Sequence, residues 1–414
     1  MCSYTIAAFG YTQTVKFTGT EGALLAQWSG ALDRDEGAVY RLIYFDGERT
    51  EEISIPQPAG EVYELRREIK ALGGKMAERK LRVCVVGAGA MGARHAEGWS
   101  TVDEARLIAV ADVDEGRARR LAEEYGFVRW TTDYRDAVAS DEVDVVSVCT
   151  PAFYHPEVAV FAAQHGKHVL CEKPIALTLE GADRMIDAAR SSGVKLGIGF
   201  QLRFSRTTEE LKEIFRRGEI GRPVMWRRNA SAPIRTIVGK PAMHDLKRGN
   251  GGPVVDESCH TFDLWRVVLG GEPVRVTARG FTFAEGREEL RDVEELAPDT
   301  AAVIVELSSG DIGVLTITWG LPPGAYGGSM ADILGPEGAI LFAKDGLKVI
   351  KEGGEEREIP CPLGGEKAEE IRHFARAILE GGEPEATGED GRIALQVSLA
   401  ALESMRKKEP VSIS

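Results

Sequence analysis

Three residues with catalytic potential lie in two apolar stretches of the chain. Lys173 directly follows a short apolar run typical of a buried strand, and Asp256 and His260 stand four residues apart in a longer apolar segment. An imidazole can remove the proton of a hydroxyl group, and an ammonium can stabilise the oxygen anion that develops. Because residues at i and i+4 share one face of a helix, Asp256 and His260 are expected side by side. The three side chains are therefore candidates for one catalytic site.

A glycine-rich segment indicates a cofactor. Residues 87–92 read Gly-Ala-Gly-Ala-Met-Gly, between a strand-like apolar run at 81–86 and a predicted helix from about Met91. The G-x-G-x-x-G spacing in this strand–turn–helix setting predicts a dinucleotide-binding turn rather than a glycine-rich turn without a ligand. The residues expected at the cofactor are Gly87, Gly89, Ala90, Met91, Gly92, Asp112, Thr150, Pro151, His155, Glu172 and Lys173.

Asp112 bears on which dinucleotide is bound. It ends the second predicted strand, 20 residues after Gly92. A carboxylate in that place accepts hydrogen bonds from the ribose 2′-hydroxyl and repels a 2′-phosphate. The first basic residue after it is Arg117, so the sequence favours NAD over NADP. The alternative role for Asp112 is a helix cap, and the alternative for His155 is a cap or a packing contact.

The surrounding pattern predicts an α/β protein of two main domains. Residues 81–200 alternate short apolar runs with amphipathic stretches, which predicts a parallel, doubly wound Rossmann sheet. From residue 201 onward most apolar runs alternate with period 2, which predicts an α+β domain with an open, mainly antiparallel sheet. Predicted helices there cover about 206–217, 254–271, 366–380 and 390–407. We expect the NAD-binding domain at 76–200, the substrate-binding and oligomerisation domain at 201–414, and the last helices packed back on the former.

Composition excludes several classes of protein. The 414 residues carry a net charge of −14, which argues against a nucleic-acid binder. No run of 18 apolar residues occurs, and residues 1–10 lack the pattern of a signal peptide. The six cysteines form no C-x-x-C pair and the seven histidines no H-x-x-x-H spacing, so no metal site is expected. We therefore expect a cytoplasmic protein with reduced thiols, and no membrane or nucleic-acid partner.

The order of these motifs resembles the Gfo/Idh/MocA (glucose–fructose oxidoreductase/inositol dehydrogenase) family across residues 81–414. Its more specific marks are Glu172-Lys173-Pro174 and the D-x-x-x-H pair of Asp256 and His260. The resemblance implies that His260 is the general base, that Lys173 holds the same substrate oxygen, and that Asp256 binds a neighbouring hydroxyl or orients the histidine. Ser258 and Cys259 depart from the family's usual glycine and aliphatic residue.

The expected activity is NAD-dependent oxidation or reduction of a secondary hydroxyl on a cyclic polyol or sugar, in a homodimer or homotetramer formed through the C-terminal sheet. Two alternatives are an NAD-dependent glycoside hydrolase on the same fold and a non-catalytic sugar-sensing protein. Further candidates for substrate contact are Arg203, which could equally join the domains by a salt bridge, His244 in a loop that could cover the pocket, and Asp263.

Residues 1–75 look like a partial copy of the C-terminal sheet. The segment GTEGAL (19–24) is similar to GPEGAI (335–340). Further along the chain, ELRREI (64–69) follows the first segment in the same order as EIRHFA (370–375) follows the second segment. The segment contains neither the glycine motif nor the lysine and the Asp/His pair, so we expect no active site in it. Because residues from Met76 onward read like a family N-terminus, our hypothesis is that 1–75 is the tail of an upstream homologous copy, either fused or included by start-site choice.

Overall fold

The computed structural model divides the chain into two compact units, Met1–Lys75 and Met76–Ser414. In the first unit the structure describes five strands, and in the second it describes residues 80–233, 241–322, 325 and 328–413. The five strands form an antiparallel sheet in sequence order. They are β1 (Ser3–Phe9), β2 (Thr12–Gly19), β3 (Gly22–Ser29), β4 (Val39–Phe45) and β5 (Thr50–Ile55).

The segments GTEGAL and GPEGAI belong to hairpins of the same register. Gly19, the last residue of β2, pairs with Gly22, the first residue of β3. Gly335 and Gly338 pair in the same way between β16 (Ser329–Gly335) and β17 (Gly338–Ala343). In both sheets this hairpin is thus followed by two antiparallel strands.

The Rossmann prediction is confirmed by a six-stranded sheet in the order β11-β10-β9-β6-β7-β8, with every neighbouring pair parallel. Its strands are β6 (Leu81–Val86), β7 (Ala105–Ala111), β8 (Arg129–Thr131), β9 (Val145–Val148), β10 (His168–Cys171) and β11 (Leu196–Ile198). The strand order reverses between β6 and β9, and such a switch point is where open α/β sheets bind ligands.

Alternate residues of β6 enter two different cores. Val83 and Val85 pack with residues of α2 (Ala90–Ser100), α3 (Glu115–Tyr125) and α11 (Glu366–Glu380). Cys84 and Val86 pack in a core that includes residues of α5 (His155–Gln164), α6 (Leu179–Ser191) and α12 (Gly388–Lys407). Helices therefore cover both faces of the sheet, as its near-continuous apolar strands predict. The helices of this part are α2 (Ala90–Ser100), α3 (Glu115–Tyr125), α4 (Tyr134–Val138), α5 (His155–Gln164) and α6 (Leu179–Ser191).

The second unit also contains a nine-stranded sheet. Its strand order is β19-β18-β17-β16-β12-β15-β14-β13-β20. Only β12 and β15 pair in parallel among its strands, so the prediction of a mainly antiparallel sheet is confirmed. The bounds not yet given are β12 (Met225–Pro233), β13 (Pro273–Phe281), β14 (Thr300–Leu307), β15 (Ile312–Leu321), β18 (Gly346–Lys351), β19 (Glu356–Pro360) and β20 (Val411–Ser412).

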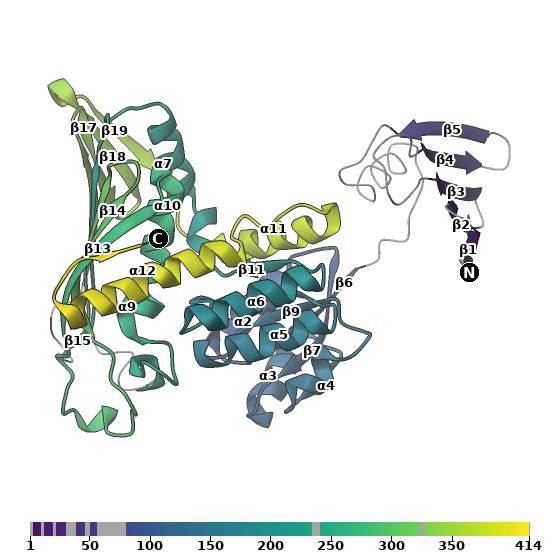
Figure 1. Cartoon of the computed structure of the whole chain (residues 1–414), viewed down its shortest axis with the longest axis horizontal. Coiled ribbons are helices and arrows are strands. Elements are labelled where there is room, and N and C mark those ends of the chain that lie inside the picture. The colour runs from purple at the N-terminus through teal and green to yellow at the C-terminus, as the bar shows by residue number, and fades with distance from the viewer. Residues whose placement is uncertain are drawn as a thin grey trace. The chain divides into compact units, whose positions relative to one another are not determined.

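Two C-terminal helices join the two parts of the second unit. Ile371 and Phe374 of α11 (Glu366–Glu380) enter the core beneath the parallel sheet. α12 (Gly388–Lys407) contacts both α6 and β13, and Figure 1 shows it running from the Rossmann sheet to the nine-stranded sheet. No helix in the described part of the chain is long and apolar enough to cross a membrane.

The helix predicted at 254–271 is divided in the structure. α9 (Gly252–Asp256) ends before Glu257, and α10 (Ser258–Leu269) begins after it. The carbonyl of Asp256 accepts hydrogen bonds from the Lys173 ammonium and the Cys259 thiol, and Ser258 Oγ donates to the Pro253 carbonyl. These side-chain bonds compete with the helical ladder, which explains the break. The second unit also contains the short 3-10 segments η1 (Ala152–Tyr154) and η3 (Pro241–His244) and the helix α7 (Arg206–Arg216).

Candidate active site

The glycine motif forms a tight turn between β6 and α2. A Cβ on Gly87, whose φ is +100°, would lie 2.6 Å from the Cys149 carbonyl oxygen, and one on Gly92 would lie 1.9 Å from the Gly87 oxygen. No heavy atom lies within 4 Å of the place where a Cβ on Gly89 would stand. Two glycines thus serve close backbone packing, and the third leaves open space. Ala90 and Met91 begin α2, whose N-terminus offers unpaired N–H groups to an anion such as a pyrophosphate.

Asp112 directly follows β7 and faces this turn. Its Oδ2 accepts a hydrogen bond from the Ala88 N–H at 2.8 Å, and its Oδ1 accepts one from the Asp114 N–H at 2.8 Å. The guanidinium of Arg117 also donates to Oδ1, with Nη2 at 2.8 Å. Arg117 is five positions from Asp112 in the sequence, but α3 brings its guanidinium onto the carboxylate. The expected ribose position therefore has a carboxylate and an arginine together.

The carboxyl end of β9 supplies the other side of the switch point. Thr150 Oγ1 is buried and has no hydrogen-bond partner among the described residues, so it is free to meet a ligand. His155 is buried, and its ring nitrogens lie 2.9 Å from the Pro174 carbonyl oxygen and 2.8 Å from that of Thr150. This histidine joins the loop of Thr150 and Pro151 to the loop of Lys173, which is a packing role rather than an open ligand-facing one.

Lys173 and Asp256 are in direct contact. Lys173 follows β10, and its Nζ donates to Asp256 Oδ1 at 3.1 Å and to the Asp256 carbonyl oxygen at 2.9 Å. Asn250 Nδ2 also donates to Asp256 Oδ1 at 3.1 Å, while its own Oδ1 accepts from the Ala152 N–H. Burial lowers the pKa of Lys173, but the Asp256 carboxylate outweighs it and raises the pKa above its usual value. The ammonium is therefore held charged against Asp256.

His260 lies one helical turn beyond Asp256, at the start of α10. Its side chain is largely buried, the ring of Phe200 lies edge-on at 5.8 Å, and its Nδ1 has no hydrogen-bond partner among the described residues. Burial, followed by the nearby ammonium of Lys173, holds the pKa of His260 well below its usual value. The imidazole is therefore neutral at neutral pH and able to accept a proton.

The two departures from the family pattern serve the helix break. Ser258 Oγ donates to the Pro253 carbonyl at 2.9 Å, and Cys259 Sγ donates to the Asp256 carbonyl at 3.1 Å. Burial raises the pKa of the Cys259 thiol to about 12, so this group stays neutral. Both side chains point into the protein and hold the segment that contains Asp256 and His260.

Two of the candidate substrate residues are paired with each other. Arg203 donates to Asp263 from Nε at 2.9 Å and from Nη2 at 2.5 Å, and both side chains are buried. Arg203 also contacts Asp390 at the start of α12. The arginine is thus engaged in buried ion pairs rather than open to a substrate, but all three residues lie within 201–414, so these pairs do not join the two domains. His244 ends η3; it is buried, faces the ring of Trp319 at 5.8 Å, and its Nε2 lacks a partner among the described residues.

A polar group beside Asp256 and His260 was not predicted from the sequence. Arg228 of β12 donates to Thr261 Oγ1 at 2.7 Å and lies 3.8 Å from Glu257, which accepts a 2.6 Å hydrogen bond from Trp319 Nε1. Glu257 and Thr261 each follow one of the predicted catalytic residues, so the spacing alone would have found this second polar stripe. Arg228, 29 positions earlier than Glu257, had no signal of its own.

Comparison with known proteins identifies two family domains in the chain. Residues 81–200 match the family described as "Oxidoreductase family, NAD-binding Rossmann fold", and residues 208–341 match the "GFO/IDH/MocA C-terminal domain". The chain is 31% identical over 342 residues to myo-inositol 2-dehydrogenase of Thermotoga maritima, covering 80% of this chain and 98% of that protein. It is 30% identical over 349 residues to scyllo-inositol 2-dehydrogenase (NAD(+)) of Bacillus subtilis, covering 81% and 97%.

Solved structures share the fold of the second unit. The crystal structure of a probable dehydrogenase from Thermotoga maritima, at 31% identity, has a TM-score of 0.66 and covers 80% of this chain and 98% of that one. Levoglucosan dehydrogenase in complex with NADH and levoglucosan has a TM-score of 0.73 over 81% and 99%; at 24% identity it shows the fold alone. Matches to both domains, and relatives matched over nearly their whole length, lead to one conclusion: the chain belongs to the Gfo/Idh/MocA family of oxidoreductases and is a dehydrogenase with an NAD-binding Rossmann domain.

Proposed function

We propose that the protein oxidises or reduces a secondary hydroxyl group on a cyclic polyol or sugar, with NAD as the cofactor. The observation that carries the proposal is the contact of Lys173 with Asp256, one helical turn from His260, at the carboxyl edge of the parallel sheet. The names of the relatives support the substrate class, because two of them are inositol dehydrogenases.

The residues divide the work of alcohol oxidation. His260, neutral because burial and Lys173 lower its pKa, accepts the hydroxyl proton. The Lys173 ammonium holds the same oxygen as negative charge develops on it. Asp256, oriented by Asn250 and Lys173, binds a neighbouring hydroxyl group of the substrate. Bound NAD supplies the acceptor for the hydride. Thr150, Pro151 and the turn at 87–92 would hold that cofactor, since they leave open space and an unpaired hydroxyl there.

A screen of NAD reduction across inositols, aldoses and sugar acids tests the proposal. Net formation of NADH with one of these compounds is the expected result. A glycoside hydrolase on this fold returns its hydride and would release sugar without net NADH. A sensor would bind a sugar and turn over nothing, and either of these results would contradict the proposal.

The pH dependence of the reaction follows from the lowered pKa of His260 and the raised pKa of Lys173. A base must be neutral to accept a proton, and the lowered pKa keeps His260 neutral to below about pH 6.5, the usual histidine value. The raised pKa of Lys173 keeps its ammonium charged above neutral pH. We therefore expect kcat/KM for alcohol oxidation to fall on the acid side only below about pH 6.5.

A series of initial rates across pH checks this expectation. In His260→Asn the acid limb should disappear and kcat should fall by about 10²–10⁴-fold, the usual contribution of a general base. An acid limb at the same pH in this variant would assign it to another group.

We propose that the catalytic protein comprises an NAD-binding domain at 76–200 and a substrate-binding domain at 201–414. Residues 1–75 would then be a partial copy of the C-terminal sheet without a site of its own, as its hairpin register supports. Because Met76–Ser414 is a compact unit, a truncation to these residues should keep kcat and KM unchanged. Steady-state kinetics of the purified truncation measure this, and a folded but inactive truncation would assign residues 1–75 a functional part.

We further propose that the open sheet pairs with a second copy of the chain. Met225, Ile304, Met330 and Leu341 are exposed on four of its strands, and the residues next to Met225, Ile304 and Leu341 in sequence pack in the core. Light scattering should give the mass of a dimer or tetramer, and a monomer would refute the pairing.

The free thiols Cys84, Cys149, Cys171, Cys259 and Cys361 fit the cytoplasmic location that we propose.

A further inference from the structure

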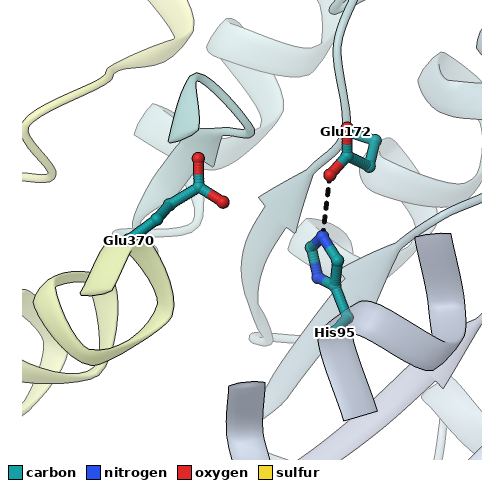
Figure 2. A group of neighbouring side chains, drawn as sticks. All are labelled: His95, Glu172 and Glu370. Carbon is teal, nitrogen blue, oxygen red and sulfur yellow. Dashed lines mark hydrogen bonds and ion pairs between the residues drawn. The ribbon is translucent and has the colours of Figure 1, made fainter. Parts of the chain in front are cut away.

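A buried polar cluster connects three distant parts of the second unit. It contains His95 of α2, Glu172 directly before the catalytic lysine, and Lys367 and Glu370 of α11. His95, Glu172 and Glu370 are each less than 5% exposed, and one nitrogen or oxygen from each lies within 4.8 Å of the others. Figure 2 shows Glu370 approaching from α11 on the side opposite His95, with the His95–Glu172 contact between ring and carboxylate.

The donor set of the cluster is one that could hold a metal ion, but a side-chain cation stands in its middle. Lys367 Nζ lies 2.6 Å from Glu172 Oε1, 2.6 Å from Glu370 Oε2 and 3.5 Å from His95 Nε2. The two carboxylates raise the pKa of Lys367 above its usual value despite burial, so the ammonium stays charged. The ammonium therefore stands between Glu172 Oε1 and Glu370 Oε2, where a divalent cation would otherwise bind, and Glu370 Oε1 has no hydrogen-bond partner among the described residues.

Three groups contact the Glu172 carboxylate: the Lys367 ammonium, the His95 ring and the backbone N–H of Lys173. Oε1 accepts from Lys367 and lies 2.9 Å from His95 Nε2, while Oε2 accepts from the backbone N–H of Lys173 at 3.3 Å. A Cβ on Gly199 would lie 3.0 Å from the carboxylate, so that glycine lets the chain of β11 pass beside it. A carboxylate held in this way fixes the backbone from which the catalytic lysine projects.

Burial and the neighbouring charges set the protonation of the cluster. Two carboxylates face one ammonium, and burial lowers the pKa of His95, which is therefore neutral. Burial also raises the pKa of Glu370 to about 7, opposed by Lys367 and assisted by Glu172. With Glu370 protonated the buried group is neutral, and Glu172 remains the carboxylate that pairs with Lys367.

We propose that Lys367, contributed by the C-terminal helix α11, is a positioning residue that acts through Glu172 to hold Lys173 in the geometry needed for hydride transfer. This inference rests on the proposed function for its catalytic readout. It assigns α11 a part in the reaction, although the hydrogen bonds of Lys367 reach Glu172, Glu370 and His95 rather than Lys173, Asp256 or His260. The distinguishing sign of a positioning role is a loss of turnover per cofactor-binding site, with the fold and NAD binding retained.

The test compares Lys367→Met with the matched control Lys348→Met in the full chain. Lys348 also forms an ion pair, at 2.6 Å with Glu356, but on β18, away from the cluster. Turnover is expressed per NAD-binding site, which is counted by NAD titration. We expect kcat of Lys367→Met to fall by up to about 10²-fold, the effect of a small misplacement of reacting groups, with unchanged NAD affinity and a larger primary deuterium isotope effect on kcat. The control should match the wild type.

A second measurement does not depend on turnover. Amide hydrogen exchange of the segment 172–175 should lose protection in Lys367→Met and not in Lys348→Met, because the Lys173 N–H donates to the Glu172 carboxylate. If Lys367→Met fails to fold, Lys367→Gln, which keeps a hydrogen-bond donor without the charge, replaces it in both measurements. Unchanged exchange at 172–175, or wild-type turnover per NAD site, would overturn the proposal. A wild-type enzyme that reduces no NAD with any sugar or polyol would instead overturn the proposed function, and the exchange result would still decide the positioning role.

Discussion

Lys173→Ala should lower kcat by about 10²–10³-fold, the usual effect of removing one group that stabilises a developing oxygen anion. The ammonium of Lys173 is held 3.1 Å from Asp256 Oδ1, and the carboxylate keeps it charged despite burial. Alanine removes the cation from the place where negative charge develops on the substrate oxygen. Steady-state kinetics of NAD reduction measure the loss, with the substrate identified by the screen.

The hydrogen bonds of this ammonium go to Asp256 rather than to the turn at 87–92, so NAD affinity should change little in Lys173→Ala. Lys173→Arg should not restore turnover, because a planar guanidinium does not replace a compact ammonium held between the Asp256 carbonyl and carboxylate oxygens. Lys195→Ala is a suitable control, since it removes an ion pair with Glu383 outside the catalytic group. A Lys173→Ala enzyme with wild-type kcat would refute the role assigned to the lysine.

Asp112→Ala should reverse or strongly reduce the preference for NAD over NADP. The carboxylate accepts hydrogen bonds from the Ala88 N–H and from Arg117, and at the expected ribose position it would repel a 2′-phosphate. Its removal takes a charged acceptor away from NAD and frees the guanidinium of Arg117 for NADP. Hydrogen bonds to charged groups contribute about 1.5–3 kcal/mol, so the ratio of kcat/KM for the two cofactors should change by about 10–10²-fold from the lost acceptor alone.

Two companion variants separate the causes of this change. Asp112→Asn keeps an acceptor for the Ala88 N–H and removes only the charge, which distinguishes charge repulsion from a loosened glycine turn. Asp112→Ala combined with Arg117→Ala should lose the gain in NADP use while NAD use stays weak. If the double variant uses NADP as well as the single one does, Arg117 takes no part in reading the 2′-phosphate.

Local patterns were the most reliable guide to the fold. The helix expected at 366–380 has these bounds because Gly365 and Gly381 adopt positive φ at its two ends. The strands β18 and β19 were missed because charged residues interrupt their apolar residues, and their pairing with each other and with β17 defines them instead. The single helix expected at 254–271 was wrong because the side chains of Lys173, Ser258 and Cys259 bind carbonyls within it.

The sequence by itself predicted the glycine turn, the parallel Rossmann sheet and the second, mainly antiparallel sheet, and it supplied the catalytic candidates that the proposal uses. Each depends on backbone conformations and periodicities set by neighbouring residues, which a sequence displays directly. Only the tertiary structure decided which charges meet. It placed Arg117 on Asp112, Arg203 on Asp263, and Lys367 between Glu172 and Glu370. A buried charge must find a partner wherever the fold brings one, and spacing along the chain does not limit that choice.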